Sequence, residues 1–179
     1  MDADTQALGW KNLGPLVATM AASALWLGTS WGDGSPAPTF APVAQKTAAA
    51  ECAACHLAYP AGLLPARSWT RLMGTLENHF GEDASLAAAE AVAVTRYLVD
   101  NAADSAQANA RARRIADGIA PGEAPLRFTE TAYFRYLHDE VPAGVWKRAK
   151  IGSRANCIAC HTRAESGSFA EREIKIPKE

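Results

Sequence analysis

The hydrophobic and polar positions along the chain predict one long apolar segment near the N-terminus, followed by a tether and a series of helices. Residues 12–32 contain no charged side chain, and residues 13–32 match the roughly 20 apolar residues that cross a bilayer as a helix. Residues 33–47 are rich in Gly, Pro, Ser and Ala, a composition typical of an extended linker. We therefore expect a membrane-anchoring segment and a flexible connection ahead of the folded part.

Two of the predicted helices carry a histidine on their apolar face. Across residues 67–80, apolar side chains recur at helical spacing and His79 lies among them. In the helix predicted over about 131–140, His138 shares a face with apolar residues, and a proline soon afterwards ends the helix. A third helix is predicted over about 85–101. Both imidazoles therefore project toward whatever these apolar faces cover.

Length and composition are those of an ordinary globular protein. The 179 residues could form one domain or two small ones, and hydrophobic residues make up 49% of the chain, enough for a packed core. The formal net charge of -1 gives no overall electrostatic signature, so nucleic acid is not indicated as a partner. Composition therefore does not indicate a function, which must be inferred from local motifs.

The motif Cys-x-x-Cys-His occurs twice and accounts for all four cysteines and two of the four histidines. The two copies consist of Cys52, Cys55 and His56, and of Cys157, Cys160 and His161. Two thiols at this spacing can each form a thioether with one vinyl group of the same porphyrin, while the adjacent imidazole reaches the iron. The pattern predicts two covalently attached c-type haems. A zinc site built from the four cysteines is the alternative, but it leaves the histidine of each motif without a role.

The remaining two histidines match the coordination positions that two haem irons leave open. An iron held by one proximal histidine has a second axial position, and His79 and His138 are the leading candidates to fill it. Met73 is the competitor at the first haem, although core filling suits its flexible thioether better. Two bis-histidine irons would be closed to small ligands and would lack the methionine that raises the haem potential, which predicts electron transfer at low potential. We favour the pairs His56–His79 and His161–His138, but a crossed pairing stays open because both distal candidates lie between the two motifs.

Residues 1–32 admit two interpretations. A cleaved signal peptide would have a basic start and small residues in an A-x-A-like arrangement after the apolar run, whereas Asp2 and Asp4 offset Lys11 here. A retained anchor fits the sequence better. Lys11 would then keep residues 1–12 in the cytoplasm, and everything after Asp33 would lie in the periplasm, where bacteria attach c-type haem.

Beyond the linker the chain divides into three predicted parts. Residues 48–103 form a first haem unit, residues 104–125 a connecting segment with a Pro-Gly breaker, and residues 126–179 a second haem unit. The connecting segment carries three arginines that could pair with haem propionates, namely Arg111, Arg113 and Arg114. Solvent exposure is the simpler expectation for them, because charge runs usually form a hydrated helix face.

Several linked motifs resemble the small bacterial diheme cytochromes c known as DHC. The resemblance covers residues 51–177 and rests on both attachment motifs with their flanks, residues 62–69, residues 79–84 and Tyr97-Leu98. It implies an all-α fold with two small haem-binding units, the first similar to a class I cytochrome c. It also implies that the irons are held by His56 and His161 as proximal ligands and by His79 and His138 as distal ones.

The same resemblance implies a periplasmic carrier that passes electrons from a membrane-bound cytochrome to a small oxygen-binding monohaem cytochrome. The retained segment at residues 13–32 departs from the usual soluble member and predicts a tethered carrier or a subunit of a membrane redox complex. We therefore expect redox proteins and membrane lipid as partners. An anchored quinol-oxidising cytochrome is the main alternative. A diheme peroxidase or a gas sensor would need an iron that opens, so four axial histidines disfavour both.

Overall fold

The structure is a computed structural model that describes residues 39–178, all of which lie within one compact unit of the chain. Its α-helices are α1 (Lys46–Ala53), α2 (Ala66–Met73), α3 (Ala88–Asp100), α4 (Ala110–Asp117) and α5 (Ala132–Leu137). Short 3-10 helices are η1 (Ala61–Leu63), η2 (Leu76–Asn78), η3 (Phe128–Glu130), η4 (Val145–Lys147), η5 (Cys157–Ala159), η6 (Ala164–Ser166) and η7 (Glu171–Glu173). The described part of the chain is thus mostly helical and contains no β-strand, as an all-α fold requires.

No helix within residues 39–178 has both the length and the apolar character needed to cross a membrane. The predicted anchor at residues 13–32 lies outside the described residues, and so does most of the predicted linker.

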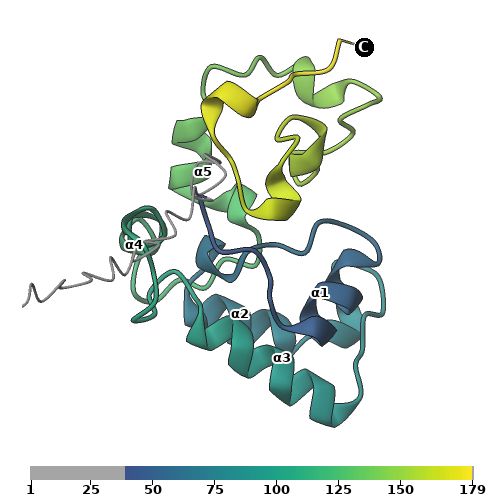
Figure 1. Cartoon of the computed structure of the whole chain (residues 1–179), viewed down its shortest axis with the longest axis vertical. Coiled ribbons are helices and arrows are strands. Elements are labelled where there is room, and N and C mark those ends of the chain that lie inside the picture. The colour runs from purple at the N-terminus through teal and green to yellow at the C-terminus, as the bar shows by residue number, and fades with distance from the viewer. Residues whose placement is uncertain (1–38, 179) are drawn as a thin grey trace, which may run out of the picture. The chain divides into compact units, whose positions relative to one another are not determined.

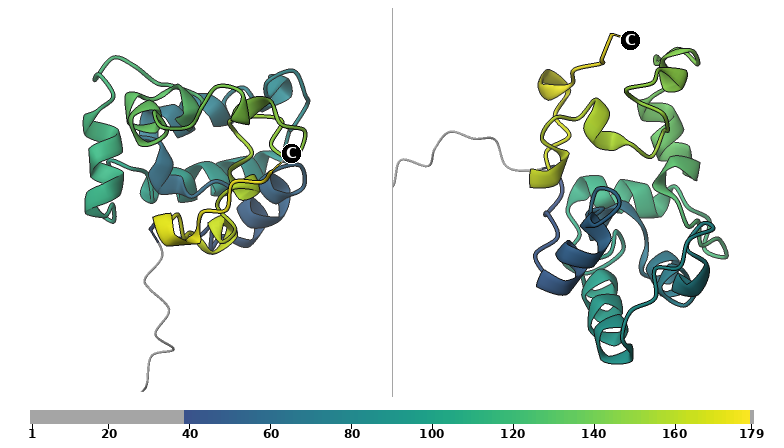
Figure 2. Two further views of the ribbon diagram at one scale, coloured as in Figure 1. Left: turned by 90° about the horizontal axis from the view of Figure 1, so that it is seen from above. Right: turned by 90° about the vertical axis from the view of Figure 1, so that its right-hand side faces the viewer.

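The first hydrophobic core lies between α1, α2 and α3, which Figures 1 and 2 show grouped together. Trp69 of α2 is 5% exposed and packs with Val94 and Leu98, which stand one turn apart on α3. The indole Nε1 donates a hydrogen bond of 2.8 Å to the carbonyl of Ala61, so the polar atom of this buried ring is paired. The core therefore fixes the loop after the first attachment motif against α2.

A second hydrophobic core joins segments that are far apart in the sequence. Phe40, Leu63 and Ile115 are buried together, and Phe169 packs against them from the C-terminal part of the chain. The rings of Phe40 and Phe169 meet edge to face with centroids 5.8 Å apart. This core ties α4 and the segment before α1 to the region that follows the second attachment motif.

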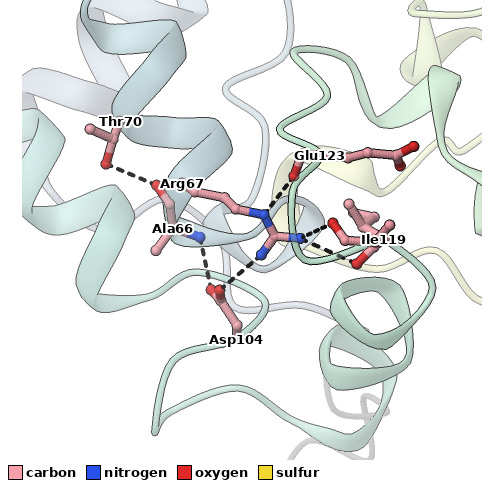
Figure 3. A network of polar contacts seen from close by, with 7 residues as sticks. Ala66, Arg67, Thr70, Asp104, Ile119 and Glu123 are labelled. Carbon is pink, nitrogen blue, oxygen red and sulfur yellow. Dashed lines mark hydrogen bonds and ion pairs between the residues drawn. The ribbon is translucent and has the colours of Figure 1, made fainter.

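Two arginines of α2 hold the segment between α3 and α5: Arg71 donates a hydrogen bond to the carbonyl of Ala124, and Arg67 makes the network shown in Figure 3. The Arg67 guanidinium donates hydrogen bonds to the backbone carbonyls of Ile119, Ala120 and Glu123, and it lies 3.6 Å from a carboxylate oxygen of Asp104. The other oxygen of Asp104 accepts a hydrogen bond from the first backbone N–H of α2. This network satisfies backbone groups that would otherwise lack partners in the connecting segment.

Two of the predicted helices are shorter than their apolar patterns indicated. The pattern over 67–80 continues past Met73, but α2 ends there with Gly74 as its C-cap, and His79 lies beyond η2 in a tight turn. The pattern over 131–140 gives α5, which ends at Leu137 with His138 as its C-cap. In both cases the histidine follows a helix end rather than standing on a helix face.

Candidate haem sites

The first attachment motif lies at the C-terminal end of α1. Cys52 belongs to the last turn of this helix, and Cys55 and His56 follow it in the turn beyond. The ring Nδ1 of His56 lies 2.7 Å from the carbonyl oxygen of Leu57, an arrangement in which Nδ1–H donates. A proton fixed on Nδ1 leaves Nε2 with a free lone pair, the form in which an imidazole binds a metal.

A turn of the backbone brings His79 opposite His56. The backbone N–H of His79 donates to the carbonyl of Glu82 at 2.7 Å, and the left-handed conformations of Phe80 (φ 58°) and Gly81 (φ 104°) close this turn. The imidazole rings of His56 and His79 have centroids 6.0 Å apart and planes inclined by 26°. Imidazoles that bind one transition metal from opposite sides, through metal–nitrogen bonds of about 2.0 Å, have centroids roughly 6 Å apart. The separation therefore fits one metal ion between the two rings.

The second attachment motif is built on η5, which holds Cys157, and on the turn that follows with Cys160 and His161. His161 forms an isolated β-bridge with Ile174, so the C-terminal segment lies alongside the motif. The Nδ1 atom of His161 is buried and has no hydrogen-bond partner in the described part of the chain. Unlike His56 and His138, His161 therefore has no backbone carbonyl that fixes its tautomer within residues 39–178.

His138 faces this second motif from the end of α5. Its Nδ1 lies 2.9 Å from the carbonyl oxygen of Phe134, one helical turn earlier, and its ring stacks on the Phe134 ring with centroids 4.1 Å apart. The ring centroid of His138 is 6.1 Å from that of His161, and the two planes are inclined by 79°. Here too, the separation matches two imidazoles on opposite sides of one metal ion.

Burial also favours the ligand form of two imidazoles, those of His79 and His161. Desolvation lowers the pKa of His79, and His56 and Arg127 lower it further. Desolvation likewise lowers the pKa of His161, with an added contribution from His138. A lowered pKa keeps an imidazole neutral at physiological pH, and only a neutral imidazole can donate its lone pair to iron.

The cysteines do not assemble into a zinc site. None of the four cysteines forms a disulfide, and within residues 39–178 no group of three or more His, Cys, Asp and Glu side chains could hold a metal ion. The four-cysteine alternative is therefore contradicted, and each pair of thiols stays with its own histidine.

The other residues considered in the sequence analysis have ordinary structural positions, in a core or on the surface. Met73 packs against the first hydrophobic core, in agreement with its interpretation as a filler of that core. The three arginines of α4 are exposed, as the hydrated-face interpretation predicts: Arg111, Arg113 and Arg114.

Two residues at the sites were given no role in the sequence analysis, although one of them, Tyr59, lies in the flank of the first motif. The Arg127 guanidinium stacks over the Phe80 ring at 3.7 Å and lines, with His79, a cleft of about 320 Å³. Tyr59 has its ring centroid 5.1 Å from that of His56, and its hydroxyl donates a hydrogen bond of 2.6 Å to the carbonyl of Ala155, next to the second motif. The contacts between Arg127 and Phe80 and between Tyr59 and Ala155 join residues far apart in the chain, so the sequence around each residue does not indicate them.

Comparisons with known proteins agree with these two sites. The family model of dihaem cytochrome c matches residues 48–169. A diheme cytochrome c from Rhodobacter sphaeroides is 49% identical, with a TM-score of 0.65, and the match covers 72% of this chain and 99% of that one. A second structure, of DHC purified from Rhodobacter sphaeroides, is 46% identical, with a TM-score of 0.60 and coverage of 72% and 99%.

A diheme cytochrome type c from Shewanella baltica OS155, sb-DHC, is 39% identical over 73% of this chain and 91% of that one, with a TM-score of 0.60. Comparison with curated protein sequences gives no match. The family match and these structures confirm the prediction of covalently attached haem. The chain belongs to the dihaem cytochrome c family and carries two covalently bound c-type haems, which makes it an electron-transfer protein.

Proposed function

We propose that this protein transfers electrons at low potential through two bis-histidine haems, with His56 and His79 as ligands of the first iron and His161 and His138 as ligands of the second. The observation that carries the proposal is the pair of centroid distances, 6.0 Å and 6.1 Å, each between one motif histidine and one histidine outside the motifs. When bound, the haems supply two one-electron iron couples. The ring pairing also supports ligation within each unit rather than the crossed arrangement.

The side chains around each pair hold the imidazoles ready to bind. The carbonyls of Leu57 and Phe134 accept hydrogen bonds from the Nδ1 atoms of His56 and His138 and so leave the lone pair of each Nε2 free for iron. With two imidazoles per iron, neither site keeps an open position for a substrate, and neither has the methionine ligand that raises a haem potential. These features favour a low-potential carrier over an enzyme that binds oxygen or peroxide.

Replacing either distal ligand tests the assignment. His79→Ala should turn the first haem high-spin and leave the second low-spin, and His138→Ala should do the reverse. EPR of the oxidised protein separates the two haems, because the iron orbitals split differently for ring planes inclined by 26° and by 79°. Met73→Leu is the control and should leave both haems low-spin. A change in the second haem after His79→Ala would show crossed pairing, and no change in either haem would refute the ligand role of His79.

We further propose that residues 13–32 anchor the protein to the bacterial cytoplasmic membrane, with both haem units in the periplasm. The uncharged apolar run and the linker composition of residues 33–47 support this placement. A membrane cytochrome or quinol-oxidising complex would be the electron donor, and a small monohaem cytochrome or another complex subunit the acceptor. The full chain should sediment with membranes, and replacement of residues 1–32 by a cleavable export signal should release haem-loaded protein into the soluble periplasmic fraction. A full chain recovered only in the soluble periplasmic fraction would refute the anchor.

A further inference from the structure

Basic side chains gather immediately before the second attachment motif. Residues 141–164 contain no Asp or Glu. Within this run, a segment that we call the basic loop, residues 147–154, carries Lys147, Arg148, Lys150 and Arg154. Arg148 is half-buried and the other three are exposed to solvent. The loop ends three residues before Cys157 and therefore leads directly into the second haem site.

Within residues 39–178 the cations of the basic loop have no acidic partners. No ion pair joins any of them to a carboxylate of the described chain. Instead, Arg148 and Lys150 donate hydrogen bonds to the backbone carbonyls of Pro177 and Lys178, which draws the C-terminal segment against the loop. Lys175 of that segment donates its backbone N–H to the carbonyl of Cys160. Two stretches of chain thus place positive charge around one attachment motif, and within residues 39–178 no carboxylate pairs with the cations of the basic loop.

Exposed apolar side chains lie at the same place. Ile158, which stands between the two cysteines of the second motif, is 45% exposed. Ile174, which forms the β-bridge with His161, is 38% exposed, and Ile176 is 46% exposed. An apolar centre within a charged rim is the composition of a protein interface, where the rim charges steer the encounter.

The two haem units differ in charge. Residues 48–103 hold three basic and six acidic side chains, whereas residues 126–179 hold ten basic and seven acidic ones. The overall charge of -1 conceals this asymmetry. An approaching protein with an acidic surface is therefore attracted to the second unit and repelled by the first.

We infer that the basic loop, Lys175 and the exposed isoleucines of the second unit form the docking surface for an acidic redox protein, which exchanges electrons at the second haem. The inference rests on the proposed electron-transfer function and adds the place of contact and the charge of the partner. The first unit then exchanges electrons with a partner of a different surface character.

The binding of flavodoxin, an acidic electron carrier used as a probe, tests this surface. The haem-loaded protein is titrated with flavodoxin at low and at high ionic strength, and the dissociation constant is measured by calorimetry. The variant Lys147→Gln/Lys150→Gln/Arg154→Gln removes three charges from the basic loop. The matched control, Arg111→Gln/Arg113→Gln/Arg114→Gln, removes three from the exposed face of α4. A Lys147→Gln/Lys150→Gln variant keeps Arg154, whose guanidinium lies 5.5 Å from the Trp146 ring, in case that contact is needed for folding.

At low ionic strength the loop variant should bind flavodoxin about tenfold more weakly than the wild type, because charges at an interface steer association. The α4 control should change the dissociation constant less than twofold, and high salt should remove the difference. In NMR spectra of the reduced protein, the backbone amide shifts caused by flavodoxin binding should cluster in residues 147–160 and 174–178. Equal weakening in both triple variants, or shifts confined to the first unit, would overturn the inference. Loss of both low-spin haem spectra would instead count against the proposed function.

Discussion

Replacement of Gly167 by alanine tests how the segment before α1 is held to the region after the second motif. Gly167 has a φ of 75°, and its carbonyl accepts a hydrogen bond of 3.0 Å from the backbone N–H of Phe40. A Cβ at this position would lie 2.0 Å from the carbonyl oxygen of Phe40 and 3.2 Å from the nitrogen of Pro42. Both atoms belong to the backbone, so neither can rotate away. Alanine therefore forces the two segments apart.

The expected cost follows from three contributions. The left-handed conformation costs an alanine about 1–2 kcal/mol. Separation of the segments breaks the hydrogen bond to Phe40, worth about 1 kcal/mol. It also withdraws the Phe40 ring, 5% exposed in the structure, from the second hydrophobic core, where full burial is worth about 1.5–3 kcal/mol. Gly167→Ala should therefore lower the free energy of unfolding by about 3–5 kcal/mol, given that the ring is only partly withdrawn.

Gly152 provides a matched control, because it also has a positive φ, 68°, but no atom lies within 4 Å of the position that an added Cβ would take. Gly152→Ala should cost only the conformational penalty of about 1–2 kcal/mol. Denaturant unfolding of the haem-loaded variants, followed by far-UV circular dichroism, measures both values. Equal losses in the two variants would refute the argument, since the backbone clash would then contribute nothing.

Three further substitutions test single contacts. The cost given for each is the expected decrease in the free energy of unfolding, measured by denaturant unfolding. Tyr59→Phe removes the hydroxyl that donates to Ala155 and should cost about 1 kcal/mol while both haems stay attached; a loss of haem would contradict a purely bridging role. Thr131→Ala removes the side-chain oxygen that caps α5 and should cost about 1 kcal/mol; an unchanged stability would show that the cap is dispensable. Trp69→Phe removes the indole N–H that donates to Ala61 and leaves a void in the first core. It should cost about 2–3 kcal/mol, and a loss below that of Thr131→Ala would contradict the packing argument.

The attachment residues could be predicted from the sequence because their chemistry is local. Two thiols and an imidazole at fixed spacing serve one porphyrin whatever the rest of the chain does. The two candidates for the second histidine could also be named from the sequence, since only His79 and His138 remained, but the sequence left open which of them faces which motif. Their positions could not be predicted. The apolar periodicity around His79 continued across Gly74, where the backbone leaves the helix and turns through Phe80 in a left-handed conformation.

Long-range contacts could not be predicted from a single sequence. Arg127 stacks on Phe80, 47 positions away, and nothing in the residues around either one indicates the other. The arginines that a charge run singled out, those of α4, are exposed instead. Arg127 stands alone in the sequence and is therefore harder to single out than the arginine cluster of α4. Its contact with the Phe80 ring nevertheless places it beside His79, at the first haem site.

His79 and His138 are held by different kinds of local structure, so we expect them to differ in rigidity. His138 is the C-cap of α5, with its ring stacked on Phe134 and its Nδ1 bonded to the carbonyl of the same residue, so the helix and the ring restrain it together. His79 lies in a two-residue bridge with Glu82 and borders an open cleft that Arg127 lines. Fewer packed neighbours and more solvent lower the free energy of local opening. Amide hydrogen exchange should therefore be faster in the turn around His79 than in α5, which makes His79 the easier of the two proposed distal ligands to displace.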